Sequence, residues 1–354
     1  MTLNTSMVTT FSAGARLSQA VLMMSVLGSS MAAYAADEVN VYSARKEALI
    51  KPMLDRFTSE TGVKVNLVTG SADALLRRLQ VEGDASPADL FITVDAGRLY
   101  RAKNAGVLQP IQDAELEARI PTNLKDSDDY WFGLSQRARV IFYHPKKVEA
   151  KALSTYENLA DAKWKGQICV RSSSNIYNQS LVASMIDADG KEATAQWLKG
   201  FVANFARPPF GGDTDLLKAV AAGVCNVTLA NTYYFGRLGN SSKASDKAVF
   251  DTLSIFWPNQ AKEQRGAHVN VSGAGVTASA EHKENAVKLI RFLSGHEAQE
   301  WYAEVNNEYP VVKGVAPPKV LQSFGAFKAD QLSLSVLGDN NRLAVELMDE
   351  AGWK

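Results

Sequence analysis

A strand-like segment, a loop and an amphipathic helix recur in that order along this chain from residue 39 onward. Residues 39–43 alternate as a strand does, and residues 46–60 carry Leu49, Met53 and Phe57 on one helical face before Gly62 ends the helix. Strand-like residues 63–68, a helix that follows residues 70–73, and strand-like residues 87–93 repeat the order. Strands that alternate with helices predict a parallel sheet covered by helices, so the fold class is α/β.

The same order returns in the second half of the chain. Residues 167–170 and 227–230 are expected to be strands, and residues 178–186 a helix. The chain is too long for one small core and suits two lobes. In sheets of this kind, ligands bind at the loops that follow the carboxyl ends of the strands.

Residues 1–36 have the pattern of a secretory signal peptide. Arg16 is the only charged residue among them, residues 20–27 are an apolar stretch, and Ala33 and Ala35 form a small-residue cleavage pattern. The apolar stretch is too short to span a bilayer. We therefore expect cleavage near Ala35 and an exported mature protein.

Charge and cysteine content narrow the range of partners. Beyond residue 36 the chain has 37 basic and 38 acidic residues, which gives no reason to expect nucleic acid or an anionic membrane surface as a partner. In an exported protein, Cys169 and Cys225 indicate one disulfide, which stabilises the fold by roughly 2–4 kcal/mol. Two separate buried thiols are the alternative.

Tyr233 and Tyr234 are adjacent and follow residues that read as a strand. In a continuing strand their side chains would point to opposite faces, whereas in a turning backbone both phenols can face one point. Phenolate oxygen is a hard anionic donor that suits a hard, highly charged cation such as Fe(III). The alternative is an ordinary aromatic pair packed in the core.

Several segments together resemble the periplasmic ferric-ion-binding proteins, the substrate-binding subunits of bacterial Fe(III) ABC transporters. The segments are residues 41–45, 88–91, 174–178, 211–215 and 231–234. The resemblance implies a two-lobed fold of the class II periplasmic binding protein type, in which each lobe has a mixed or parallel sheet flanked by helices and crossing strands form a hinge. The expected N-terminal lobe is 37–138 plus 264–314, and the expected C-terminal lobe is 139–263 plus 315–354.

The resemblance also implies a set of metal ligands. Tyr233 and Tyr234 match the paired tyrosine ligands of the family, and Tyr143 matches a third tyrosine that one branch uses. Three phenolates would balance the charge of Fe(III). Tyr42 is a further candidate ligand.

Carbonate or a similar synergistic anion is expected to complete the coordination. Arg101 looks like the arginine that holds this anion, and Arg45 stands where other branches place a histidine ligand, so it is expected to help hold the anion. Tyr177 lies in a strand-end loop, where packing or a hydrogen bond is the expected role. The four histidines are expected to face solvent; they are His144, His268, His282 and His296.

The resemblance implies a monomeric binding protein that carries ferric iron, free or as a chelate, to an inner-membrane ABC permease. No motif pairs a nucleophile with a base, so an enzyme is not expected. One alternative is a binding protein for a small organic ligand of the thiamine, polyamine or phosphonate type, with the tyrosines stacked on that ligand. Others are an exported enzyme, and a binder of Fe(II) or another divalent metal, which would favour histidine or cysteine ligands.

Overall fold

The computed structural model describes residues 37–354, and the expected signal peptide in residues 1–36 lies outside these described residues. Within the described part of the chain, no helix is both long enough and apolar enough to cross a membrane.

The strands of the described residues join in one mixed sheet. Their order is β2-β1-β3-β8-β4-β6-β5, and β7 pairs with β4. The strands are β1 (Glu38–Ser43), β2 (Lys64–Thr69), β3 (Leu90–Val94), β4 (Phe132–Tyr143), β5 (Ile168–Cys169), β6 (Val227–Asn231), β7 (Ser254–Phe256) and β8 (Val269–Val276). β1 pairs in parallel with β2 and β3, as does β5 with β6, whereas the pairs made by β4 and β8 are antiparallel. The predicted α/β class is confirmed.

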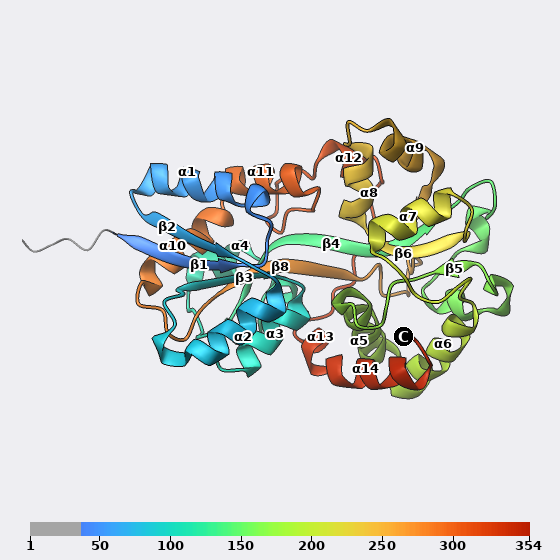
Figure 1. Ribbon diagram of the computed structural model, residues 1–354, viewed down its shortest axis with the longest axis horizontal. Helices are drawn as coiled ribbons and strands as arrows, with labels where there is room; N and C mark the ends of the chain where they lie inside the picture. Colours follow the sequence, from blue (N-terminus) through green and yellow to red (C-terminus); the bar gives the residue numbers. More distant parts are fainter. Residues whose placement is uncertain (1–36) are drawn as a thin grey trace, which may run out of the picture. The chain divides into compact units, whose positions relative to one another are not determined.

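Two long strands connect the parallel groups. β4 pairs with β8 as far as Ala138 and with β6 from Arg139 onward. Figure 1 shows β4 and β8 running from the β1–β3 group to the β6 group, which is the arrangement expected of crossing strands. The lobe boundaries expected from the sequence stay a prediction, although the change of partner within β4 falls at residues 138 and 139.

Helices cover both faces of each parallel group. Figure 1 shows α1 and α11 on one side of β1–β3, and α2 and α3 on the other. The helices are α1 (Lys51–Thr61), α2 (Ala72–Glu82), α3 (Ala96–Asn104), α4 (Ala114–Arg119), α5 (Ile176–Asp189), α6 (Lys191–Ala203), α7 (Asp213–Ala221), α8 (Thr232–Gly239), α9 (Ala244–Thr252), α10 (Lys283–Leu293), α11 (His296–Asn306), α12 (Lys319–Gln322), α13 (Val336–Asp339) and α14 (Asn341–Glu350).

The first helix starts later than the sequence pattern indicates. A helix was expected from residue 46, but residues Glu47–Leu49 form a separate 3-10 turn and α1 begins at Lys51. Pro52 has no backbone N–H to donate to the preceding turn, so an α-helix cannot run through it without losing a hydrogen bond. The expected end is confirmed, because Gly62 caps α1 with a φ of 75° and donates its N–H to the Thr58 carbonyl.

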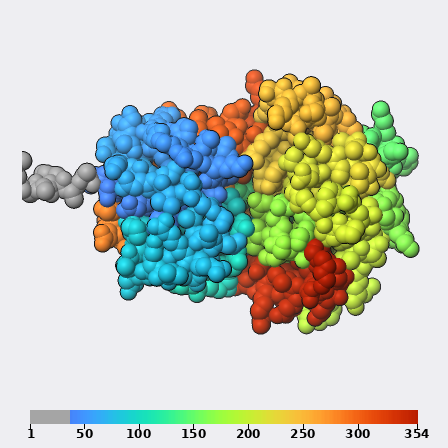
Figure 2. Space-filling model, viewed as in Figure 1, coloured from blue at the N-terminus to red at the C-terminus, as the bar shows by residue number. Residues whose placement is uncertain are grey.

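α5 is buried on most of its surface and therefore holds its first turn in a fixed place. Apolar and small residues occur all around this helix, which is typical of a helix enclosed by other elements. α6, α13 and α14 pack against it, and α13 also contacts α3. Figure 2 shows the C-terminal residues, in red, beside both the cyan and the green segments.

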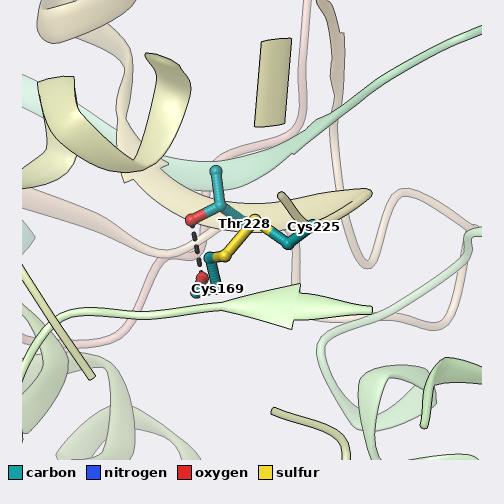
Figure 3. Close-up of a disulfide and its surroundings, with 3 residues drawn as sticks. All are labelled: Cys169, Cys225 and Thr228. Carbon is teal, nitrogen blue, oxygen red and sulfur yellow. Dashed lines mark hydrogen bonds between the residues drawn. A yellow bond between two sulfur atoms is a disulfide. The ribbon is translucent and has the colours of Figure 1, made fainter. Parts of the chain in front are cut away.

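The predicted disulfide is confirmed. Cys169, at the end of β5, is bonded to Cys225, which lies just before β6. The Thr228 hydroxyl donates a hydrogen bond of 2.8 Å to the Cys169 carbonyl (Figure 3). The disulfide therefore ties together the two parallel strands whose carboxyl ends lead toward Tyr177 and Tyr233.

Candidate metal centre

Tyr233 and Tyr234 lie in the first turn of α8, which begins directly where β6 ends. Successive residues of an α-helix are about 100° apart around its axis, whereas successive residues of a strand point to opposite faces. The change from strand to helix after Asn231 therefore brings both rings to one side, with centroids 4.2 Å apart and planes tilted by 31°. The turning backbone expected at this pair is present.

A third tyrosine meets the pair from α5. Tyr177 is the second residue of that helix, and its N–H donates to the side chain of Asn175, the N-cap residue. The Tyr233 hydroxyl donates to the Tyr177 hydroxyl over 3.2 Å. Three phenols thus converge at the N-terminal ends of two helices, and we call Tyr177, Tyr233 and Tyr234 the tyrosine cluster.

The place of Tyr177 beside the pair was not predicted, although the expected hydrogen bond is present. One signal could have found it. β5 and β6 are parallel neighbours, so the loops that follow them open at the same edge of the sheet. Tyr177 follows β5 and Tyr233 follows β6, which makes a meeting of the two side chains the natural expectation.

Burial keeps the hydroxyls of the pair protonated in the protein alone. Desolvation raises the pKa of Tyr233 well above its ordinary value, and the neighbouring Tyr177 and Tyr234 add to the rise. Desolvation likewise raises the pKa of Tyr234 to about 12. Both hydroxyls are therefore neutral near pH 7, and ionising them requires a strong positive charge close by. A highly charged metal ion is such a charge.

Arg137 brings a buried cation to the edge of the cluster. It lies on β4, is 2% exposed, and donates from Nη2 to Ser272 Oγ and to Glu308 Oε1, the latter over 3.2 Å. Its Nε and Nη1 make no hydrogen bond to another described residue. Its charge lowers the pKa of Tyr233, which partly offsets the effect of desolvation. These two nitrogens carry three N–H bonds, the kind of donor that holds an anion.

Two further arginines flank the cluster. The guanidinium of Arg237 lies 4.9 Å from the ring centre of Tyr233 and 5.8 Å from that of Tyr234. Arg171 lies 5.7 Å from the ring centre of Tyr177, and its charge lowers the pKa of Tyr234. The surroundings of the cluster are therefore cationic, which favours phenolate and an anionic ligand.

With this geometry in hand, comparison with known proteins gives the family. The bacterial extracellular solute-binding protein family matches residues 52–329. This chain belongs to that family.

The solute-binding protein is similar to proteins of iron uptake. It is 51% identical over 317 residues to Iron uptake protein A1 of Synechocystis sp., covering 90% of this chain and 88% of that protein. A structure of a Trichodesmium protein (IdiA, FutA) in complex with iron and citrate is 53% identical, with a TM-score of 0.87 over 90% of this chain and 100% of that chain. Apo FutA2 from Synechocystis is 44% identical, also with a TM-score of 0.87, over 90% and 100% of the two chains. The predicted resemblance and the two-lobed fold are confirmed.

Tyr143 does not join the tyrosine cluster in this solute-binding protein. It lies opposite Val227, the first residue of β6, whereas Tyr233 follows Asn231, the last residue of that strand. Four residues of an antiparallel strand span about 14 Å. Tyr143 is buried in the hydrophobic core at the other end of β6. The structure therefore does not bring Tyr143 beside the pair, and Tyr177 lies there instead.

Tyr42 and Arg101 are engaged elsewhere. The Tyr42 hydroxyl donates to the carboxylate of Glu82 over 3.1 Å, and the guanidinium of Arg78 lies 4.7 Å from its ring centre. Arg101 is half-buried on α3 and donates to Asp73 over 3.1 Å. None of these contacts involves the tyrosine cluster.

Arg45 is buried but its donors are used inside the protein. Its Nη2 bonds Glu308 Oε2 at 2.5 Å and its Nε donates to the Tyr302 hydroxyl. Glu308 also forms an ion pair with Arg137, so Arg45 is connected to the cluster only through this shared carboxylate. The anion-holding role expected of Arg45 stays a prediction.

The described residues offer no alternative metal site of the usual kind. Within 37–354, no three histidine, cysteine, aspartate or glutamate side chains are placed to hold a metal ion. The expectation that all four histidines face solvent is wrong for His268, which is 2% exposed. Desolvation lowers its pKa to about 3, so it is neutral.

Proposed function

We propose that this protein binds ferric iron through the phenolate oxygens of the tyrosine cluster and serves as the substrate-binding subunit of an iron transporter. The observation that carries the proposal is the convergence of Tyr177, Tyr233 and Tyr234 from two helix starts. Three phenolates carry a charge of −3, which matches that of Fe(III), so the metal and its three protein ligands together have no net charge. A divalent metal bound by the same three phenolates would leave a net charge of −1.

An anion completes the coordination in this proposal. The unpartnered Nε and Nη1 of Arg137 are the groups best placed to hold it, in the role that the sequence suggested for Arg101 and Arg45. Carbonate is the anion suggested by the family resemblance. Citrate is supported by the Trichodesmium structure, which contains iron and citrate.

Proton release accompanies loading. Because the hydroxyls of Tyr233 and Tyr234 are neutral before iron binds, each must lose its proton as it becomes a ligand. Acidification then favours the protonated tyrosines and iron release.

The transport steps follow from the fold and the family. We propose that the crossing strands β4 and β8 act as the hinge and that iron binding favours the closed form. The closed form would then dock, as a monomer, on an inner-membrane ABC permease. Export to the periplasm would remove the signal peptide near Ala35.

The test is a titration of the purified protein with ferric citrate, followed by visible absorption, for wild type, Tyr177→Phe and Tyr143→Phe. Tyrosinate–Fe(III) bonding gives a visible charge-transfer band. We expect the band in wild type and in Tyr143→Phe, and a weaker, shifted band in Tyr177→Phe.

If the band is lost in Tyr143→Phe and kept in Tyr177→Phe, the third ligand is Tyr143, as the family resemblance implies, and not Tyr177. Absence of any band or retained iron in wild type would contradict the ferric function. That result would favour an organic ligand in the same site.

A further inference from the structure

A buried arginine on β4 connects every segment that carries a tyrosine of the cluster. Arg139 is 2% exposed and lies opposite Asn231 in the sheet. Its Nη1 donates to Asp213 Oδ2 at 3.0 Å and to Asn231 Oδ1 at 3.2 Å. Its Nη2 donates to Asn178 Oδ1 at 2.7 Å and to the Leu229 carbonyl at 3.1 Å. All four N–H bonds of the two Nη atoms are therefore used.

The partners of Arg139 stand next to the tyrosines in the chain. Asn178 directly follows Tyr177 in α5. Asn231 is the last residue of β6 and precedes Tyr233 by two positions. One guanidinium thus fixes both the start of α5 and the start of α8 relative to β4.

Asp213 completes this arrangement from α7. Its Oδ2 accepts the Asn231 N–H at 2.8 Å in addition to Arg139, and its Oδ1 accepts Arg171 Nη1 at 3.0 Å. The carboxylate is fully buried and has two cationic partners. Asn178 in turn donates from Nδ2 to the carbonyls of Arg171 and Ser172, which closes the connection around the start of α5.

We infer that Arg139 and Asp213 are positioning residues for iron binding: they hold Tyr177 and the Tyr233–Tyr234 pair at the mutual distance that one ferric ion requires. This inference rests on the proposed function. Neither residue is a ligand in it. They bond residues next to the ligands and not the ligands themselves, so they act by fixing the segments that carry the ligands, one step further out than the hydrogen-bonded partners of metal ligands in other sites.

Lysine cannot replace Arg139 in this role. A guanidinium is planar and directs its N–H groups in a fixed fork, whereas an ammonium has three donors on a flexible stem. Arg139→Lys keeps the charge that Asp213 needs but cannot reach Asn178, Asn231 and the Leu229 carbonyl together. The segments that carry Tyr177 and Tyr233 are then no longer held by one shared side chain.

The chain offers a matched control in Arg265. This arginine is also largely buried, and its Nη1 donates to Asp330 at 3.1 Å and to Ser184, which lies in α5 seven residues beyond Tyr177. Among the described residues, its hydrogen bonds reach neither the first turn of α5 nor that of α8. A loss of stability from replacing a buried arginine by lysine should appear in Arg265→Lys as well. A change in the visible band or in iron affinity should not appear in Arg265→Lys.

The experiment measures ferric citrate titrations by visible absorption, with thermal unfolding of the metal-free protein in parallel, for wild type, Arg139→Lys, Arg265→Lys and Asn178→Ala. We expect Arg139→Lys to weaken iron binding by about 10–100-fold and to shift the charge-transfer band. Arg265→Lys should keep the wild-type band and affinity even if its melting temperature is lower. Asn178→Ala, which removes only the connection to α5, keeps the test valid if Arg139→Lys does not fold, and it should change the band in the same direction.

Two results would overturn the inference. If folded Arg139→Lys or Asn178→Ala keeps the wild-type band and affinity, the positioning inference is refuted. The proposed iron site at the tyrosine cluster would then still stand. Absence of a band in wild type would refute the proposed function and this inference with it.

Discussion

Among the described residues, the ion pairs of two buried arginines, Arg45 and Arg137, are made with Glu308 alone, so its removal should be costly. Its Oε2 bonds Arg45 at 2.5 Å and its Oε1 bonds Arg137 at 3.2 Å. Ser135 also donates to it, and the glutamate is fully buried. In Glu308→Gln the two guanidinium groups stay buried without a counter-charge. Breaking a buried pair in this way costs about 3–5 kcal/mol of unfolding free energy.

The pKa of Glu308 gives an independent magnitude. Burial alone would raise it, but the charges of Arg45 and Arg137 lower it to about 2. The unfolded value is about 4.3, so the difference corresponds to about 3 kcal/mol. A carboxylate with a depressed folded pKa stabilises the protein above its unfolded pKa. That contribution is lost as pH falls from about 4.3 toward 2.

Urea unfolding of wild type and Glu308→Gln at pH 7 and at pH 3 measures both effects. We expect the gap in unfolding free energy to be about 3–5 kcal/mol at pH 7 and smaller at pH 3. Glu297→Gln is the control, since Glu297 is exposed and its pair with Arg56 should contribute less than about 1 kcal/mol. A gap at pH 7 no larger than that of the control, or a gap that widens at pH 3, would refute the reasoning.

Three further predictions concern the disulfide, the pH dependence of binding and the packing of α13. Replacing Cys169 and Cys225 by serine should lower the unfolding free energy by roughly 2–4 kcal/mol in urea, and an unchanged midpoint would contradict this. Iron affinity, measured by competition with citrate, should fall between about pH 8 and pH 5 because protons compete for the raised-pKa tyrosines, and a flat profile would count against phenolate ligands. Gly338→Ala places a methyl group against the ring of Tyr100, so it should cost about 1–3 kcal/mol in the same urea assay; no loss would show that α13 and α3 can separate.

Local patterns predicted much of the fold. The alternation in residues 39–43 and the Gly62 stop became β1 and the end of α1, and residues 227–230 became β6 with one more residue. These features depend on neighbours in the chain, which the sequence contains directly. The disulfide was also predictable, because an exported chain with two cysteines has one simple way to pair them.

Features that depend on packing were not predicted. Tyr177 reaches Tyr233 only because α5 is enclosed by other helices and its start is tied to β6 through Arg139. The burial of His268 depends in the same way on the elements that pack around the crossing strands. No local pattern encodes such contacts, and the third phenol was assigned to Tyr143 from the family resemblance.

The most direct test of the account is a crystal structure of the protein grown with ferric citrate, with anomalous scattering measured at the iron absorption edge. The account predicts one anomalous peak bonded to the phenolic oxygens of Tyr177, Tyr233 and Tyr234, with an anion between the metal and Arg137. An iron peak bonded to other residues, or an organic molecule stacked on the tyrosines with no iron present, would contradict it.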